Sequence, residues 1–146
     1  MTNKSAAYLL HQLVFELDRA ADSLLRTQIG ISYKRAVFLL VLEECGTVTQ
    51  HELAVALGYS DPSISTMLVE LAKEGYLQTI VSPQHARKRL VSITAKGSEV
   101  VAQGRQLLDA HFDRLMQAAG VDAQHYHDLN EQVYLALMAK MKKERS

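Results

Sequence analysis

Several residue types that mark specialised proteins are scarce in this sequence. Its 146 residues include one cysteine and two prolines, and tryptophan is absent. The single cysteine, Cys45, excludes an intrachain disulfide and is typical of a reducing compartment. Basic and acidic residues number 16 each, so their charges cancel. A general positive excess is thereby excluded, and any surface that attracts nucleic acid must be local.

Long apolar runs and catalytic motifs are also missing. No run approaches the roughly 20 apolar residues that span a bilayer, and His11, Gln12 and Glu16 interrupt what would be a signal peptide's apolar core. We therefore expect a cytoplasmic protein with no membrane partner. The sequence contains neither Gly-x-Ser-x-Gly nor His-Glu-x-x-His, and its histidines lack metal-ligand spacing. We expect no enzyme activity, no cofactor and no metal.

The one thiol is expected to be structural. Cys45 follows Glu43 and Glu44, whose negative charges disfavour a thiolate. No second cysteine is present to form a disulfide with it within the chain. The sequence therefore predicts a packed thiol at a helix end rather than a redox switch.

Hydrophobic periodicity predicts mostly helices. Leu9, Leu13, Leu17, Ala20 and Leu24 form one apolar face of a helix over 4–27. The run 37–42 fits a buried strand or a buried helix, and its charged flanks together with Gly46 favour the helix.

A second group of signals predicts short elements in the middle of the chain. A β-branched segment at 47–49 precedes a helix over 49–57, which opens with a capping box of Thr49 and Glu52. Ser60 is expected to cap the next helix. Two strands over 76–81 and 89–93 form a hairpin, and two helices follow, capped by Thr94 and Asp122.

This order predicts a mainly α fold with a small β-hairpin. We expect a single domain over 1–146, with a winged helix-turn-helix lobe at about 32–97 and dimerisation helices over 1–30 and 98–146. The terminal helices carry more apolar surface than so small a core covers, which favours a second copy as their partner. The predicted interface residues are Leu9, Leu13, Leu108, Phe112, Leu115, Leu129, Val133 and Leu137.

Several motifs occur in a familiar order. They are Gly30-Ile31-Ser32, residues 46–54 (GTVTQHELA), residues 57–60 (LGYS) and the junction at 90–97. In this order and spacing the chain resembles the MarR family of bacterial transcription regulators over nearly its whole length. The family's loop usually carries Asp-x-Arg, whereas this chain has His85-Ala86-Arg87.

The resemblance implies a homodimer that binds a pseudo-palindromic operator in double-stranded DNA, most simply as a repressor. The recognition helix, 60–74, would enter the major groove, and the wing, 82–89, would lie near the minor groove. Release by a small aromatic or acidic effector is a further implication. An alternative is a ligand- or protein-binding dimer of the same fold that has lost tight DNA binding.

The recognition helix raises this alternative because Asp61 to Leu71 includes no Lys or Arg. Hydroxyls and methyls would then read bases, while the wing attracts phosphate. Alternation would place Arg87 and Arg89 on one face of the wing and Lys88 on the other. The predicted DNA contacts are Thr49, Gln50, Ser60, Ser63, Ser65, Thr66, Val69, His85, Arg87, Lys88 and Arg89.

Aromatic and polar residues of the first two helices suggest an effector site. Tyr and His would anchor a ligand through their polar atoms. The candidates are Tyr8, His11, Phe15, Tyr33, Arg35 and Phe38. An aromatic cluster in the dimer interface, with Arg35 as ordinary surface charge, remains the alternative.

Overall fold

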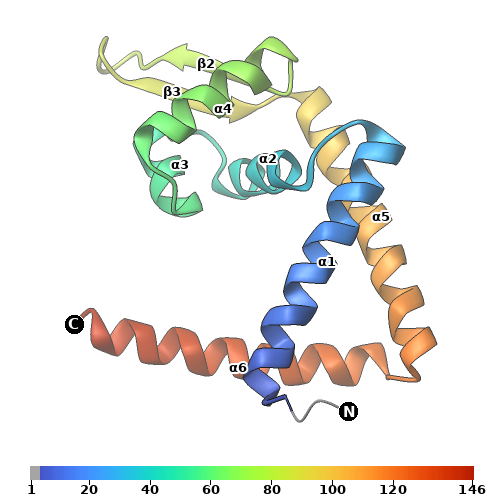
Figure 1. The fold of residues 1–146 in the computed structure, drawn as a ribbon. Helices are drawn as coiled ribbons and strands as arrows, with labels where there is room; N and C mark the ends of the chain where they lie inside the picture. The colour runs from blue at the N-terminus through green and yellow to red at the C-terminus, as the bar shows by residue number, and fades with distance from the viewer. Residues whose placement is uncertain (1–3) are drawn as a thin grey trace. The chain divides into compact units, whose positions relative to one another are not determined.

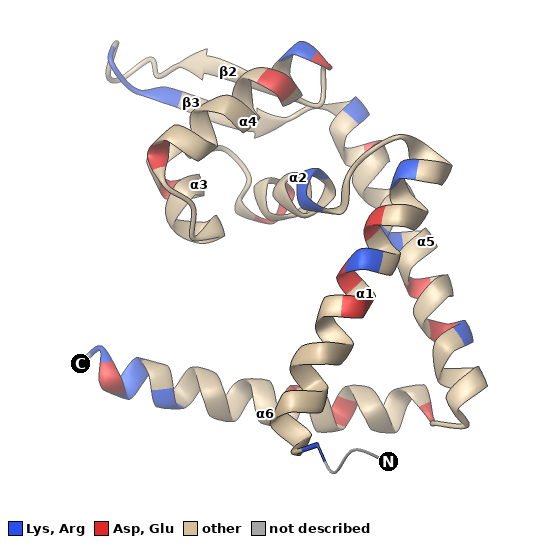
Figure 2. Cartoon of the chain, viewed as in Figure 1, with Lys and Arg blue, Asp and Glu red and all other residues tan. Residues whose placement is uncertain are grey.

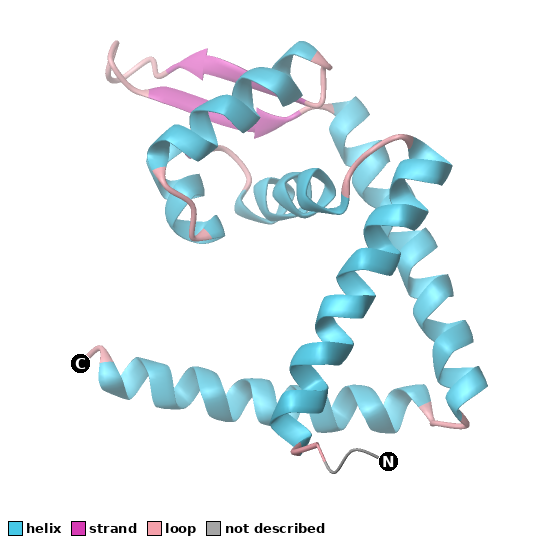
Figure 3. Cartoon of the chain, viewed as in Figure 1, coloured by secondary structure: helices cyan, strands magenta, loops and turns pink. Residues whose placement is uncertain are grey.

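The computed structural model describes residues 4–146 as six helices and a small three-stranded sheet. It groups them into two compact units, of which one ends at Leu107 and the other begins at Leu108. The predicted division at about 32–97 stays a prediction, because the units separate within a helix. The elements are α1 (Ala6–Ile29), α2 (Tyr33–Cys45), β1 (Val48–Thr49), α3 (Gln50–Leu57), α4 (Asp61–Lys73), β2 (Leu77–Val81), β3 (Arg89–Ile93), α5 (Ala95–Ala119) and α6 (Ala123–Glu144). Figures 1 and 3 show the helices and the two longer strands, β2 and β3.

Side chains cap most of the predicted helix starts. Thr49 Oγ1 accepts from the Glu52 N–H, and the Glu52 carboxylate accepts from the Thr49 N–H at 2.8 Å, which confirms the capping box of α3. Asp122 caps α6 at 2.7 Å, and Thr94 Oγ1 accepts from Gly97 at the start of α5. Ser60 occupies the N-cap position of α4 as expected, but its hydroxyl donates to Ser63 Oγ at 3.0 Å and makes no cap bond to the backbone.

The sheet confirms the predicted hairpin and extends it. β2 and β3 pair antiparallel from Leu77↔Ile93 to Val81↔Arg89. β1 adds to the other side of β3 through Val48↔Val91, so the order is β1-β3-β2. The short β-branched segment thereby ties the start of α3 to the hairpin.

α2 supplies the centre of the first unit. Phe38, Leu39 and Leu42 are fully buried, and α2 contacts α1, α3 and β3. The run 37–42 is therefore a helix, as its charged flanks indicated. It lacks a polar stripe because neighbours cover it on several sides.

The buried face of α1 differs from the predicted one. Ala21 and Leu25 are buried, one position after the expected Ala20 and Leu24, which are half-buried. α5 approaches at this level, because a Cβ on Gly104 would contact Leu25 Cδ2 at 3.6 Å. The face of α1 that is buried within the chain therefore lies about 100°, one residue step, from the predicted apolar face.

The second unit comprises the end of α5 and all of α6. The Phe112 and Tyr126 rings lie 6.0 Å apart and tilted, and the turn between the helices uses Gly120 at φ 67°. None of the described side chains of α6, residues 123–144, is buried. A 22-residue helix with no fully buried side chain has few stabilising contacts of its own.

Candidate nucleic-acid interface

The outward face of α4 is the first part of the candidate interface. Ile64, Leu68 and Leu71 are buried against the unit, which turns the opposite face toward solvent. Val69 is 69% exposed. The outward residues are those predicted from the sequence, namely Ser63, Ser65, Thr66, Val69 and Glu70.

Hydrogen bonds within the protein occupy hydroxyls on this face. Ser65 Oγ donates to the Asp61 carbonyl at 3.1 Å, and Thr66 Oγ1 donates to the Pro62 carbonyl at 3.3 Å. Ser65 Oγ also accepts from Gln50 Nε2 at 2.7 Å, which joins α3 to α4. A hydroxyl whose hydrogen is committed can only accept. Base amino groups therefore suit Thr66 better than phosphate oxygens, and its methyl suits thymine.

The wing loop is the second part of the interface. Figure 2 shows basic residues gathered where β2 and β3 are joined. His85, Arg87, Lys88 and Arg89 are all exposed, and the Lys88 N–H donates to the His85 carbonyl in a turn. The predicted alternation of Arg87, Lys88 and Arg89 is wrong. Only Arg89 lies in a strand, and the pleat that alternates side chains does not extend into the turn.

Two open grooves flank the base of the wing. The larger, of about 510 Å³, is lined by Thr49, Gln50, His51, Glu52, Arg87, Lys88 and Arg89. The smaller, of about 350 Å³, is lined by Gln50, Ser65, Leu68, Val69, Ala72, Thr79 and Arg89. Gln50 and Arg89 line both. The start of α3, the outward face of α4 and the wing are therefore continuous.

The larger groove contains one acid. The Thr49 N–H donates to the Glu52 carboxylate and holds its pKa below the ordinary value, with smaller contributions from Lys88 and His51. Glu52 therefore stays ionised among the cations. Five lining residues are absent from the predicted contacts, namely His51, Glu52, Leu68, Ala72 and Thr79.

The structure corrects one of the six predicted effector residues. Phe38 is fully buried in the core, which corrects its assignment to a ligand surface. His11 and Phe15 line a groove of about 430 Å³ on α1 with Gln12 and Glu16. Tyr8 is exposed on the same helix. Tyr33 and Arg35 lie at the start of α2, so the remaining five candidates divide into two groups and stay predictions.

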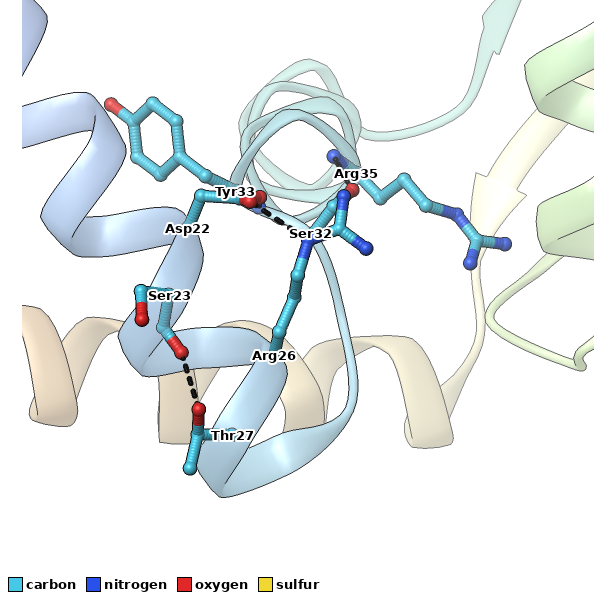
Figure 4. Close-up of polar contacts among 7 residues, drawn as sticks. All are labelled: Asp22, Ser23, Arg26, Thr27, Ser32, Tyr33 and Arg35. Carbon is cyan, nitrogen blue, oxygen red and sulfur yellow. Dashed lines mark hydrogen bonds and ion pairs between the residues drawn. The ribbon is translucent and has the colours of Figure 1, made fainter.

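Asp22 joins α1 to the start of α2. Figure 4 shows its carboxylate between Arg26 and the backbone of Tyr33. One oxygen accepts from Arg26 Nε at 2.8 Å and the other from the Tyr33 N–H at 2.9 Å. These bonds, Arg26 first, hold the pKa of Asp22 below its ordinary value. Burial raises the pKa of the Tyr33 phenol, and Asp18 adds to this.

The low pKa of Asp22 predicts acid sensitivity. Its stabilisation is complete above the unfolded-state pKa, about 4, and is lost as pH falls through the lower folded-state pKa. We expect wild type to lose more free energy of unfolding than Asp22→Asn over this range, measured by urea denaturation. Parallel pH profiles for the two proteins would contradict the prediction.

Three further predictions concern metal-ligand clusters, the burial of the Cys45 thiol and membrane-spanning helices. Within residues 4–146 no group of three or more His, Cys, Asp or Glu side chains could hold a metal ion. Cys45 is exposed, so the expected packed thiol is wrong. Its position at the last residue of α2, just before Gly46, leaves it beyond the buried part of that helix. No helix among residues 4–146 is both long and apolar enough to cross a membrane.

Known proteins resemble this chain in sequence over one segment and in fold over most of its length. A model of the MarR family matches residues 29–88, and no curated protein matches the sequence. Apo wild-type MarR from E. coli is 20% identical, with a TM-score of 0.79 over 94% of this chain and 99% of that one. A MarR mutant complexed with operator DNA is 21% identical, with a TM-score of 0.73 over 88% and 91%.

A solved structure from a second organism has the same fold as this chain. MepR, a transcription regulator of the Staphylococcus aureus multidrug efflux pump MepA, is 20% identical, with a TM-score of 0.71 over 93% of this chain and 98% of that one. At these identities the similarity to solved structures shows the winged-helix fold. The match over residues 29–88 is a similarity of sequence to the MarR family. Residues 29–88 of this chain therefore match a model of the MarR family, and the chain has the winged-helix fold of the solved MarR and MepR structures.

Proposed function

We propose that the chain is a homodimeric repressor that binds a pseudo-palindromic operator in double-stranded DNA. The observation that carries this is the continuity of the exposed wing cations with the outward face of α4, through the two grooves that share Gln50 and Arg89. Cations at the wing attract phosphate without regard to sequence, and α4 meets base edges. Occupancy of an operator that overlaps a promoter excludes polymerase, so repression needs no catalytic step.

The exposed apolar surface supports the dimer. Exposed leucines and valines lie on the first half of α1 and along α6, where water is an unfavourable partner. A second copy related by two-fold symmetry would cover the same surface on both chains. The exposed members include Tyr8, Leu9, Leu10, Val14, Phe15, Leu129, Val133, Tyr134, Leu135 and Leu137.

A charge placed on this surface tests the dimer. Val133 is 65% exposed in the single chain. We expect Val133→Asp to weaken dimerisation by at least about tenfold, because burying an unpaired carboxylate is strongly unfavourable. Sedimentation equilibrium measures the change. The control is Val55→Asp on α3, which is 69% exposed and outside the proposed interface. Equal dimer dissociation constants for the two variants would contradict this interface.

A small aromatic or acidic effector remains part of the proposal. Tyr33 and Arg35 at the start of α2, and Tyr8, His11 and Phe15 on α1, offer two separate places where polar and aromatic groups could contact it. Hydrogen exchange with an added aromatic acid distinguishes the two places, because the bound acid slows the exchange of nearby backbone amides.

The alternative function rests on one observation. Asp61 and Glu70 on α4 are exposed, and both would repel phosphate. This favours a ligand- or protein-binding dimer that has lost tight DNA binding.

One experiment separates the two functions. The purified protein is incubated with fragmented genomic DNA from the organism that encodes it, at two salt concentrations. The DNA fragments that bind are recovered and sequenced. Enrichment of an inverted repeat supports the repressor. Failure to enrich any repeat at low salt, where charge attraction is least screened, supports the alternative.

A further inference from the structure

The residue that follows α4 is held by two cations from other helices. The Glu74 carboxylate accepts from Arg35 Nη2 of α2 at 2.6 Å. Its backbone carbonyl accepts from Lys96 Nζ of α5 at 2.7 Å. Positive charge is favourable at this end of a helix, where the carbonyl dipoles point. The end of α4 is thus tied to α2 and α5 together.

The Arg35–Glu74 pair differs from the other ion pairs formed by residues 4–146. Arg19–Glu16 and Arg26–Asp22 each lie within one helix, and the pairs of His51 and His127 involve well-exposed imidazoles. Arg35 and Glu74 are 39 residues apart, and their side chains are 21% and 44% exposed. Partial burial weakens screening by water and salt, so this pair fixes α4 more firmly than a surface pair would.

The two ends of α4 are held by different partners. Beyond Glu74, the Gly75 carbonyl accepts from Thr94 Oγ1 at 2.6 Å. At the other end, Gln50 Nε2 of α3 donates to Ser65 Oγ at 2.7 Å. The start of α4 is thus tied to α3, the other helix of the helix-turn-helix, whereas its end is tied by Glu74 to α2 and α5. The direction of α4 relative to α2 and α5 is therefore set at Glu74, far from Ser63, Ser65 and Thr66.

The length of α4 amplifies any change at that end. Thirteen residues extend about 20 Å, so a tilt of roughly 5° about Glu74 moves the start of the helix by about 1.7 Å. Hydrogen bonds to base edges tolerate only a few tenths of an ångström. The attraction between the wing cations and DNA phosphates falls off slowly with distance. Such a tilt therefore weakens this attraction much less than it weakens the hydrogen bonds to bases.

We propose that Arg35 and Glu74 are positioning residues that set the direction of the recognition helix and thereby its sequence discrimination. The inference rests on the proposed DNA-binding function and adds a determinant that touches no base. Among residues 4–146, Arg35 Nε is buried and has no hydrogen-bond partner, so the pair depends on one end of the guanidinium. A lysine can make that single bond, which provides a conservative rescue.

The test compares two DNAs for each variant. One is the inverted repeat enriched by wild type, and the other is an unrelated duplex of equal length. For Arg35→Met and Glu74→Gln we expect the Kd for the repeat to rise about tenfold or more, with less than about twofold change for the unrelated duplex. The double variant should lose no more than either single one, because each change removes the same contact.

Two controls keep the result specific. Arg35→Lys should retain most of the discrimination. Arg19→Met removes one positive charge from an exposed pair within α1 and should leave both Kd values unchanged. Thermal unfolding identifies any variant that has lost its fold. Glu74→Gln, which keeps the size of the side chain and removes the charge of the ion pair, is then the deciding variant.

The outcomes separate the inference from the function it rests on. An enriched repeat whose Kd is unchanged in both variants overturns the positioning role and leaves the proposed function intact. Equal weakening on both DNAs also overturns it, since that is an effect of charge. A wild type that enriches no repeat overturns the proposed function, and the inference with it.

Discussion

Replacing Arg87, Lys88 and Arg89 together with alanine is expected to abolish DNA binding at physiological salt. These exposed cations follow one another in the wing and line the larger groove. In the proposed dimer, each cation that meets a phosphate contributes about 0.9 to the slope of log Kd against log salt concentration. Roughly six contacts correspond to a slope change of about 5 and a loss of about four orders of magnitude in affinity. Fluorescence anisotropy across a salt series measures both.

The control removes as much charge from elsewhere. Lys142, Lys143 and Arg145 are exposed at the end of α6 and its cap. Alanine at all three should change affinity by less than about threefold, through long-range electrostatics alone. If the two triple variants lose affinity equally, total charge and not the wing governs binding.

Gly97→Ala is expected to have the largest effect on folding. A Cβ at this position would lie 2.1 Å from the Tyr76 carbonyl oxygen and 2.6 Å from Ile93 Cγ1. The carbonyl cannot withdraw without breaking the hydrogen bond that it accepts from the Thr94 N–H at 3.1 Å. We expect a loss of about 3 kcal/mol, at the upper end for overpacking. For a chain of this size the melting temperature should fall by about 6–12 °C.

Gly104→Ala is the matched control in the same helix. A Cβ there would meet Leu25 Cδ2 at 3.6 Å and Ile29 Cδ1 at 3.8 Å, which are ordinary contacts. Alanine favours a helix interior by up to about 1 kcal/mol over glycine. This variant should therefore melt at the wild-type temperature or slightly above it. Similar melting temperatures for the two alanine variants would contradict the close approach at Gly97.

Local chemistry explains why much of the fold could be predicted. Thr49 and Glu52 are three residues apart, and Asp122 caps a helix that begins at the next residue, so short windows of sequence contain both partners. The hairpin follows from two β-branched runs and a polar loop between them. The wing alternation failed for an equally local reason, because the turn at His85–Lys88 replaces extended strand just before Arg89.

The candidate site depended more on distant partners. Gln50 and Ser65 are 15 residues apart, and their hydrogen bond changes what the recognition helix offers to DNA. Arg35 could not be assigned its partner Glu74 from sequence, because nothing in either segment signals the other. Phe38 carried the same aromatic signal as Tyr33, and only the packing of α2 separates a core residue from a half-buried one.

The exposed surface of α6 has a consequence for the rate at which the cell would degrade this protein. A solitary helix of this length is marginal in water, so under the proposed dimer a newly made chain carries a frayed segment until it meets a second one. Proteases cleave such segments and spare covered ones. Unpaired chains would be removed as they appear, and the lifetime of the regulator would lengthen as its own abundance rises.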